Sequence, residues 1–223
     1  MIKINHKRAI FLTTLVTLAT SCSTIPTNTA TYKLIYAGIF GYEDIVLDPS
    51  YIESLPYSSM KVKVGKGPGG LAILESVNDL KETWVTSDAV YLIIKGGRII
   101  SSQGFVETNL VDYSSKDISF KDFLDSNQDQ AVTYRYMSYD KPEALNVRFK
   151  VITMKKGIER IKILDYERDL YLIEETIEND YINWKTKNRF WVDKDSGFVW
   201  KSSQTYAPNI PKLNIEVTKR PPL

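Results

Sequence analysis

The feature that most limits the fold of this chain is an alternation of apolar and polar residues with a period of two, which starts at Met60 and continues through the second half. Successive side chains of a β-strand point to opposite faces of a sheet, so this period is typical of strands. Turns rich in Gly, Asn and Asp separate the alternating stretches at intervals of roughly 8 to 12 residues. The pattern predicts an antiparallel sheet of roughly ten strands.

The predicted strands are short in the first half of the sequence and longer in the second. The short ones are 61–64, 71–77, 80–86, 89–94 and 99–100. The longer ones are 134–139, 145–154, 158–166, 170–177, 188–193 and 198–203. The Gly96-Gly97 pair and the 194–197 stretch predict tight hairpin turns, because glycine adopts the positive φ angles that such turns need.

Only two short segments favour a helix. Residues 32–40 carry apolar groups at helical spacing, and residues 119–124 begin with Ser119, a good N-cap. A sheet of many strands with so little helix to cover its edges must curl. We therefore expect a mainly β fold, a curled antiparallel sheet (half-barrel or open barrel) with one or two short helices, forming a single domain over residues 32–223.

The first 21 residues have the layout of a secretory signal. Lys3, Lys7 and Arg8 precede an apolar run over 9–19. That run is about half the ~20 residues that a membrane-spanning helix needs. Small residues then lead directly to Cys22, the only cysteine of the chain.

The stretch from Leu18 to Cys22 resembles a bacterial lipobox. The resemblance implies cleavage before Cys22 and its acylation with diacylglycerol and a further fatty acid such as palmitate. Several acyl chains give stable anchoring, since each buried methylene contributes ~0.8 kcal/mol. We expect residues 1–21 to be a signal peptide and residues 22–31 a lipidated tether. Ser23 rather than Asp follows the cysteine, which by the same resemblance implies the periplasmic side of the outer membrane.

Removing residues 1–21 changes which functions the composition allows. The chain has 29 basic and 27 acidic residues, and the signal holds three of the basic ones and none of the acidic ones, so the rest has a net charge of −1. A near-neutral body argues against nucleic-acid binding. The only histidine, His6, is also lost, which excludes Ser-His-Asp and Cys-His catalysis and Cys/His zinc sites.

Two motifs resemble ligand sites but predict turns. Residues 65–70 fit the G-x-G-x-x-G pattern of dinucleotide sites, yet a strand follows them where such a site needs a helix. Residues 193–197 resemble the start of a calcium loop, but Gly197 is at its fifth position and Gln204 at its twelfth, where a bidentate carboxylate is needed. We therefore predict no cofactor and no metal.

Paired carboxylates can hydrolyse glycosides without histidine, and Glu174, Glu175 and Glu178 are candidates. Neighbours 174 and 175 must point to opposite faces of a strand, while 174 and 178 would be about 13 Å apart at strand rise, beyond the usual catalytic separation. We assign no catalytic residue and expect no enzymatic activity. A polysaccharide-modifying enzyme that uses paired carboxylates remains an alternative.

Aromatic residues make up 12% of the chain. Trp rings stack on sugars and also fill β-sheet cores. Trp84 and Trp191 both lie in predicted strands, and Trp191 must face away from its neighbour Phe190. These two tryptophans are therefore candidate contacts for a glycan or a protein partner.

Four segments together resemble the YjbF/GfcB family, the group 4 capsule polysaccharide lipoproteins. They are 55–60 (Leu-Pro-Tyr-Ser-Ser-Met), 80–91, Asn109-Leu110, and 188–193 with Ser196-Gly197. The similarity runs from about Tyr32 to Val217 and implies an outer-membrane lipoprotein needed to make or export capsule or exopolysaccharide. It carries over no catalytic residue. We expect a non-enzymatic accessory factor, anchored by Cys22, that contacts the polysaccharide or its secretion proteins.

The alternative function is a periplasmic carrier. A curled sheet of this kind has a concave face, and such a carrier would hold acyl chains or glycan there. It requires a continuous apolar lining, and an inward face closed by side chains would argue against it.

Overall fold

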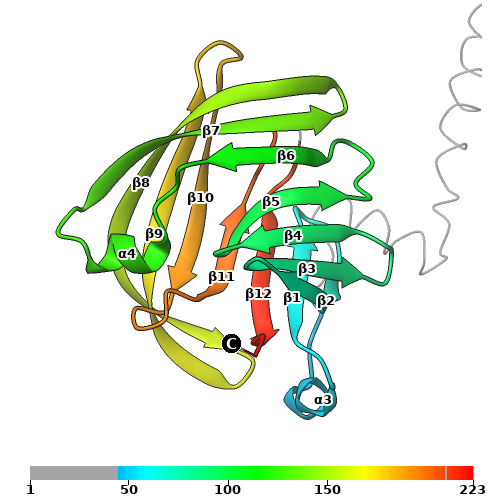
Figure 1. Cartoon of the computed structure of the whole chain (residues 1–223). Coiled ribbons are helices and arrows are strands. Elements are labelled where there is room, and N and C mark those ends of the chain that lie inside the picture. Colours follow the sequence, from blue (N-terminus) through cyan, green and yellow to red (C-terminus); the bar gives the residue numbers. More distant parts are fainter. Residues whose placement is uncertain (1–44, 209, 223) are drawn as a thin grey trace, which may run out of the picture. The chain divides into compact units, whose positions relative to one another are not determined.

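Twelve antiparallel strands join into one sheet within residues 45–208 and 210–222, the part of the chain that the computed structural model describes. Strands β1 to β5 pair in sequence order, and so do β6 to β12. The pairing of β1 with β12 joins the two series into a single sheet. The expected mainly β, curled antiparallel fold is confirmed (Figure 1).

The bounds of the strands are as follows. The first series comprises β1 (Ser59–Val64), β2 (Gly69–Asn78), β3 (Lys81–Thr86), β4 (Tyr91–Lys95) and β5 (Arg98–Gln103). The second comprises β6 (Leu110–Ser115), β7 (Gln130–Asp140), β8 (Glu143–Ile163), β9 (Tyr166–Asn179), β10 (Trp184–Val192), β11 (Val199–Gln204) and β12 (Leu213–Lys219).

The two edge strands, β5 and β6, meet through side chains. The Ser101 hydroxyl donates to the carbonyl of Leu110 over 3.0 Å, and the N–H of Leu110 donates to the Ser102 hydroxyl over 2.9 Å. The sheet therefore curls into a nearly closed barrel. Edge strands that bond in this way leave fewer free backbone groups for pairing with another chain.

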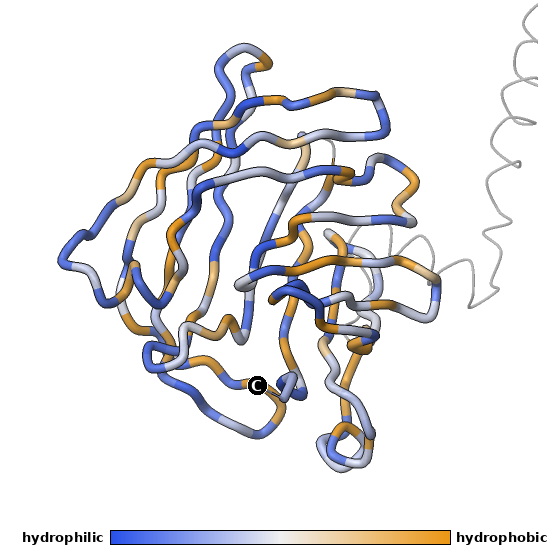
Figure 2. Tube along the Cα trace, viewed as in Figure 1, coloured by the Kyte–Doolittle hydropathy of each residue, from blue (hydrophilic) through white to orange (hydrophobic). Residues whose placement is uncertain are grey.

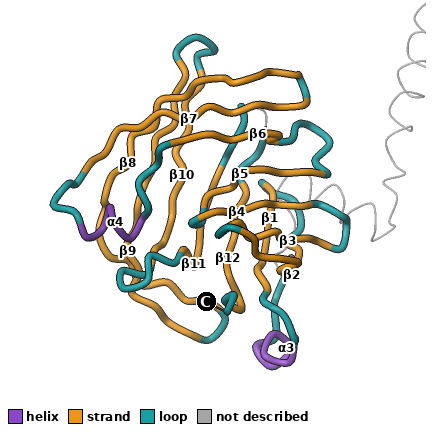
Figure 3. Tube along the Cα trace, viewed as in Figure 1, coloured by secondary structure: helices purple, strands orange, loops and turns teal. Residues whose placement is uncertain are grey.

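Two short helices flank the sheet within the described residues (Figure 3). Helix α4 (Phe120–Asp125) begins where the sequence predicts, because the Ser119 hydroxyl accepts the N–H of Asp122 over 3.0 Å. Helix α3 (Pro49–Ser54) is not predicted, although Asp48 caps it and Pro49 occupies its first turn. The expected helix at 32–40 lies outside the described residues. Neither α3 nor α4 is long and apolar enough to cross a membrane.

The interior of the barrel holds two apolar clusters. The smaller cluster packs Phe120 and Phe123 of α4 against Ile173, Phe190 and neighbouring residues. The larger cluster gathers the alternate side chains of most strands around Phe149 and Leu213. Figure 2 shows the alternation of hydrophobic and hydrophilic residues along the strands that produces this division. Each fully buried side chain of this size contributes ~1.5–3 kcal/mol.

The second half contains longer strands than the sequence predicts. Strand β8 runs unbroken for 21 residues. The turn expected at 155–157 is wrong: a β-bulge lies there, with Lys155 opposite Ile173 and Gly157 opposite Leu172. Gly157 adopts a φ of 130°, which lets the strand bend without ending. The turn expected at 168–169 is also wrong, since the chain reverses just before Tyr166.

The two predicted hairpin turns are confirmed. Gly96 and Gly97 join β4 to β5 with φ angles of 54° and 80°, as a tight two-residue turn requires. Between β10 and β11, the N–H of Asp193 donates to the carbonyl of Phe198 over 2.8 Å. Residues 65–68 likewise form a turn between β1 and β2, as expected.

Candidate ligand cavity

A cavity of about 800 Å³ opens at one end of the barrel. Its walls come from the turns between β2 and β3, β4 and β5, and β10 and β11, together with the end of β12 and the residues after it. Antiparallel pairing brings these turns to the same end of the sheet. Its volume lies within the range of small-molecule sites in proteins.

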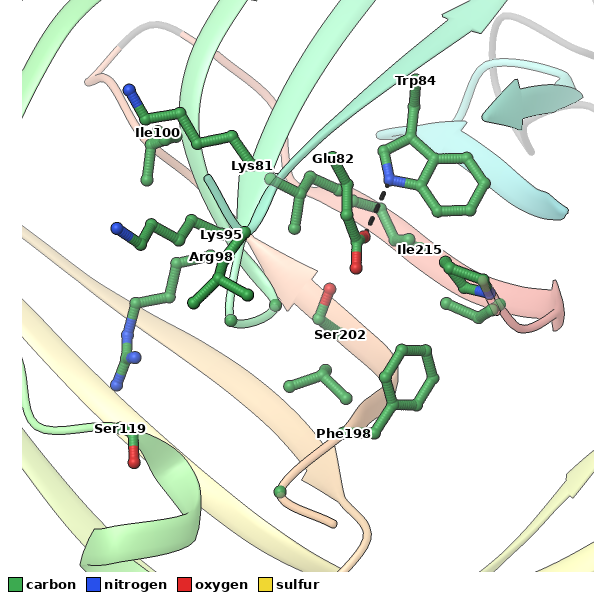
Figure 4. Close-up of a pocket in the computed structure, with 18 of the residues that line it drawn as sticks. Lys81, Glu82, Trp84, Lys95, Arg98, Ile100, Ser119, Phe198, Ser202 and Ile215 are labelled. Carbon is green, nitrogen blue, oxygen red and sulfur yellow. Dashed lines mark hydrogen bonds between the residues drawn. The ribbon is translucent and has the colours of Figure 1, made fainter. Parts of the chain in front are cut away.

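One side of the cavity is cationic. Lys81 lies directly opposite Lys95 in the β3–β4 pair, and Lys95 lies opposite Arg98 in the β4–β5 pair. Figure 4 shows the three side chains extending to the same side. Arg220, near the C-terminus, adds a further guanidinium to the lining.

The other side is apolar. Trp84 is 1% exposed, and Phe198 packs edge-on against Trp200 with 5.0 Å between the ring centroids. Trp84 points to the face of β3 opposite to Lys81, and Figure 4 shows Trp84, Phe198 and Ile215 away from the Lys81 and Lys95 side chains. Further apolar residues around the cavity, on either side, are Met60, Val77, Leu80, Ile94, Ile100, Val199, Val217, Pro221 and Pro222.

Glu82 lies beside Trp84, on the same face of β3 (Figure 4). Its carboxylate accepts the indole N–H of Trp84 over 3.0 Å. Burial raises the pKa of Glu82 above its usual value, while the hydrogen bond from Trp84 and the charge of Arg220 act in the opposite direction.

A buried ion network adjoins the cationic side. Glu175, which is fully buried, accepts on Oε1 from Arg98 Nε over 2.9 Å and from Arg135 Nη2 over 2.7 Å. Arg135 also donates from Nε to Asp117 Oδ2 over 2.7 Å. Arg98 stacks on Phe120, with 3.7 Å from its guanidinium carbon to the ring centroid. Two guanidinium groups and two carboxylates balance one another, so the network carries no net charge.

The network fixes the ionisation of Asp117 and Arg135. Burial by itself favours the neutral form of Asp117, but the charges of Arg135 and Arg98 and the hydrogen bond from Arg135 hold the pKa of this carboxyl well below its usual range. Burial opposes the charge of Arg135 as well, yet Glu175 and Asp117 raise the pKa of Arg135 above its usual value. Asp117 and Arg135 therefore stay charged at neutral pH.

The structure separates the two tryptophans that the sequence singles out. Trp84 lines the cavity, with its ring inside the barrel. Trp191 is absent from the cavity lining and donates its indole N–H to Glu159 over 2.7 Å. Phe190 points inward and is fully buried, so the two neighbours face opposite sides as expected. Contact of either tryptophan with a glycan or partner remains a prediction, and Cys22 lies outside the described residues.

The three candidate carboxylates also divide between two faces. Glu175 joins the interior network, while Glu174 pairs with Lys187 over 2.9 Å on the other face. Glu178 pairs with Lys150 and Lys185. No group of three potential metal-binding side chains occurs among residues 45–208 and 210–222.

The interior network is not predicted from the sequence. One signal for it exists, because Arg135 is in phase with Met137 and Tyr139 on β7, and both of these are buried. The alternation thus places a cation on the inward face, where it needs a carboxylate partner. The choice of Glu175 and Asp117 as its partners depends on strand register.

Comparison with known proteins gives consistent matches. The family described as group 4 capsule polysaccharide lipoprotein gfcB, YjbF matches residues 32–218. Lipoprotein YjbF of Escherichia coli K12 is 23% identical over 173 residues, covering 76% of this chain and 79% of its own length. Lipoprotein GfcB of the same organism is 21% identical over 189 residues, covering 82% and 84%.

A solved structure has the same fold. The crystal structure of the hypothetical lipoprotein YmcC from Escherichia coli K12 superposes with a TM-score of 0.70 at 19% identity, over 78% of this chain and 90% of that one. The family match spans most of the chain and includes nearly all of the described barrel. The chain therefore belongs to the YjbF/GfcB family of group 4 capsule polysaccharide lipoproteins.

Proposed function

We propose that this protein is a non-enzymatic accessory factor in the production or export of capsule or exopolysaccharide, attached through Cys22 to the periplasmic face of the outer membrane. The observation that carries the proposal is membership, over residues 32–218, in a family of capsule polysaccharide lipoproteins. Lipid attachment is common to lipoproteins. The choice of membrane depends on Ser23 following Cys22.

The hydrogen bonding of the cavity carboxylates supports binding rather than catalysis. Asp117 accepts from Thr133 on Oδ1 over 2.9 Å, and from Arg135 and Ser115 on Oδ2 over 2.7 and 2.9 Å. A carboxylate held in this way has little freedom to attack a substrate or move a proton. Glu82 is the remaining acidic residue of the lining, whereas glycoside hydrolysis by carboxylates calls for a pair.

The interior argues against a carrier that hides acyl chains along the whole concave face. Arg98, Arg135, Asp117 and Glu175 interrupt the apolar lining, and side chains of the two apolar clusters fill much of the inward face. Such a carrier needs a continuous apolar surface, because hydrocarbon cannot form hydrogen bonds with charged side chains that face it.

Deletion of the gene tests the proposed role. We expect surface polysaccharide to fall and to return when the wild-type gene is supplied in trans. Unchanged surface polysaccharide in a clean deletion contradicts the role. Purified polymer incubated with the protein provides the second readout: we expect no new reducing ends and no change in chain length, and either change favours the enzyme alternative.

A further inference from the structure

One part of the outer surface of the barrel carries an excess of positive charge. We call it the basic face: the outward side chains of residues 148–156 of β8, 174–178 of β9 and 185–189 of β10, three strands that lie side by side (Figure 1). Its basic residues are Arg148, Lys150, Lys156, Lys185, Lys187 and Arg189. Its acidic residues are Glu174 and Glu178. The excess is local, because the chain after residue 21 has a net charge of −1.

Two further charges border the basic face. Lys212 donates from its ammonium group to the carbonyl oxygen of Lys187 over 2.9 Å. Asp180 lies in the turn after β9 and is exposed. These two charges offset each other, so the excess of basic over acidic side chains on the face is unchanged.

The two carboxylates of the basic face hold the cations in place without neutralising them all. Glu174 accepts from Lys187 over 2.9 Å and lies 3.5 Å from Arg189, and Glu178 pairs with Lys185 over 2.9 Å. The carboxylates are 7% and 16% exposed, whereas these three cations are 51–63% exposed. The surface that solvent meets is therefore mostly cationic, and each carboxylate keeps more than one cation in position.

Two tyrosines on β7 lie beside these cations. Tyr134 is opposite Lys150 and Tyr136 is opposite Arg148, so all four side chains point outward. Tyr134 and Tyr136 are 42% and 37% exposed. The Arg148 guanidinium lies over the Tyr134 ring, 4.0 Å from its centroid. Half-exposed aromatic rings of this kind provide flat apolar surfaces that can stack on sugars.

The spacing of the cations favours a polymer over a membrane surface. Lys185, Lys187 and Arg189 alternate along β10, so their Cα atoms follow one another at about 6.6–6.8 Å. An ordered row of this kind matches a chain that carries charged groups at regular intervals. Anionic lipids in a fluid bilayer attract basic residues whatever their spacing, and they give no reason for tyrosine rings beside the row.

We propose that the basic face binds an acidic polysaccharide, whose carboxylate or phosphate groups lie against Lys185, Lys187 and Arg189 and whose sugar rings stack on Tyr134 and Tyr136. The inference rests on the proposed role in polysaccharide production and names the chemical class of the polymer. Many weak contacts along one chain give useful affinity, because each contact after the first is intramolecular.

The binding test uses the full chain, purified from its own membranes in micelles of the uncharged detergent dodecyl maltoside. Isothermal titration calorimetry with oligogalacturonides, which carry a carboxylate on each sugar, measures the affinity. Their methyl esters keep the backbone and remove the charge, and we expect them to bind at least about tenfold more weakly. Galacturonic acid itself should also bind far more weakly. Raising the ionic strength from about 0.1 M to about 1 M shortens the Debye length from ~10 Å to ~3 Å and should remove most of the binding.

The variant Lys185→Gln/Lys187→Gln tests the cationic row. We expect it to weaken binding of oligogalacturonides about three- to tenfold, since two exposed charged contacts are lost. Glu178 keeps Lys150 as a partner and Glu174 keeps Arg189, so circular dichroism and thermal unfolding should match the parent protein.

Lys162→Gln/Lys194→Gln is the matched control. It removes the same charge at exposed positions, near the end of β8 and in the turn after β10, and both positions lie outside the basic face. We expect this variant to bind oligogalacturonides as the parent protein does. Equal weakening in the control and in Lys185→Gln/Lys187→Gln would show that only the overall charge matters and would overturn the proposal.

Tyr134→Ala/Tyr136→Ala separates recognition of sugar from attraction of any anion. We expect it to weaken binding of oligogalacturonides by about two- to tenfold although no charge changes. Tyr51→Ala, at an exposed tyrosine of α3, should leave binding unchanged. Unchanged binding in Tyr134→Ala/Tyr136→Ala contradicts the stacking of sugars on these rings.

Two further results would overturn the proposal. One is full displacement of oligogalacturonides by micelles that contain phosphatidylglycerol, which identifies an anionic membrane surface as the occupant. The other is a surface polysaccharide without uronate or phosphate groups in the cells that make this protein. The binding test is separate from the deletion test: unchanged surface polysaccharide in the deletion contradicts the proposed role, whereas binding that is indifferent to charge, to Lys185 and Lys187 and to the tyrosines contradicts the basic face alone.

Discussion

Arg135 on β7 donates to Glu175 on β9 over 2.7 Å, across the full width of the intervening strand β8. Both side chains are buried inside the barrel. Removing two charges from water is costly, so a buried pair of this kind adds little net stability compared with apolar residues. Removing only one partner of the pair is strongly destabilising, because the charge that remains is buried without water and without a partner.

Glu175→Ala should therefore destabilise the domain strongly. The change leaves Arg98 and Arg135 without their shared acceptor, and we expect the free energy of unfolding to fall by about 3–5 kcal/mol. Urea unfolding followed by circular dichroism measures the loss. Asp169→Asn, which breaks an exposed pair with Arg160, is the control and should leave the urea midpoint close to wild type. Equal effects of the two substitutions would contradict a structural role for the interior network.

Asp117 should make stability depend on pH in the acid range. Its pKa is lower in the folded state than the usual value of ~3.9, so the unfolded chain binds more protons as the pH falls. The stabilisation is present above about pH 5 and is lost as the pH drops through the folded pKa. We expect the free energy of unfolding of Asp117→Asn to fall less steeply between about pH 5 and pH 3 than that of wild type. Parallel curves would show that this carboxyl does not contribute.

Gly96 and Gly97 provide a matched pair in one turn. A Cβ at Gly97 would lie 2.2 Å from Val199 Cγ2, whereas a Cβ at Gly96 would meet nothing within 4 Å. Both positions have positive φ, which costs alanine ~1–2 kcal/mol. We expect Gly96→Ala to lose about that much stability and Gly97→Ala to lose a further ~1–3 kcal/mol from overpacking. Thermal unfolding of the two variants compares them, and a smaller loss at Gly97 would contradict the close approach to Val199.

Much of the fold follows from the period of two, but the sequence pattern leaves strand boundaries ambiguous. Residues 155–157 combine two lysines with a glycine, and both a turn and a bulge use such a sequence. Residues on both sides of Gly157 pair with β9, so the segment forms a bulge and not a turn. Strands β6 and β12 are missing from the prediction, although Leu213, Ile215 and Val217 alternate clearly with polar residues.

The cavity could be predicted only in part. Trp84 is identified from its residue type, but Lys81 and Lys95 look like ordinary solvent-facing lysines until the register places them opposite each other. Arg220 comes from the C-terminal end of the chain, and no spacing rule relates it to β3 or β4. Contacts between distant segments depend on how the sheet curls, which a local pattern does not encode.

Cys22 is predicted to attach the protein to a membrane. In the Cys22→Ser variant the thiol that would carry the diacylglycerol is absent, so the protein should leave the membrane fraction and lose its fatty-acid label. Fractionation and metabolic labelling with palmitate measure the two effects. A variant that stays in the membrane and keeps the label would show that the anchor is elsewhere.

The most direct test of the proposed role is the amount of surface polysaccharide made by cells whose only copy of the gene encodes Cys22→Ser, compared with cells carrying the wild-type gene and with the deletion. If the domain acts in polysaccharide production at the membrane, the variant should be folded and present at wild-type amount, yet surface polysaccharide should fall toward the level of the deletion. Wild-type surface polysaccharide in both the deletion and the variant would contradict the proposed function, and a defect in the deletion alone would contradict the need for the anchor.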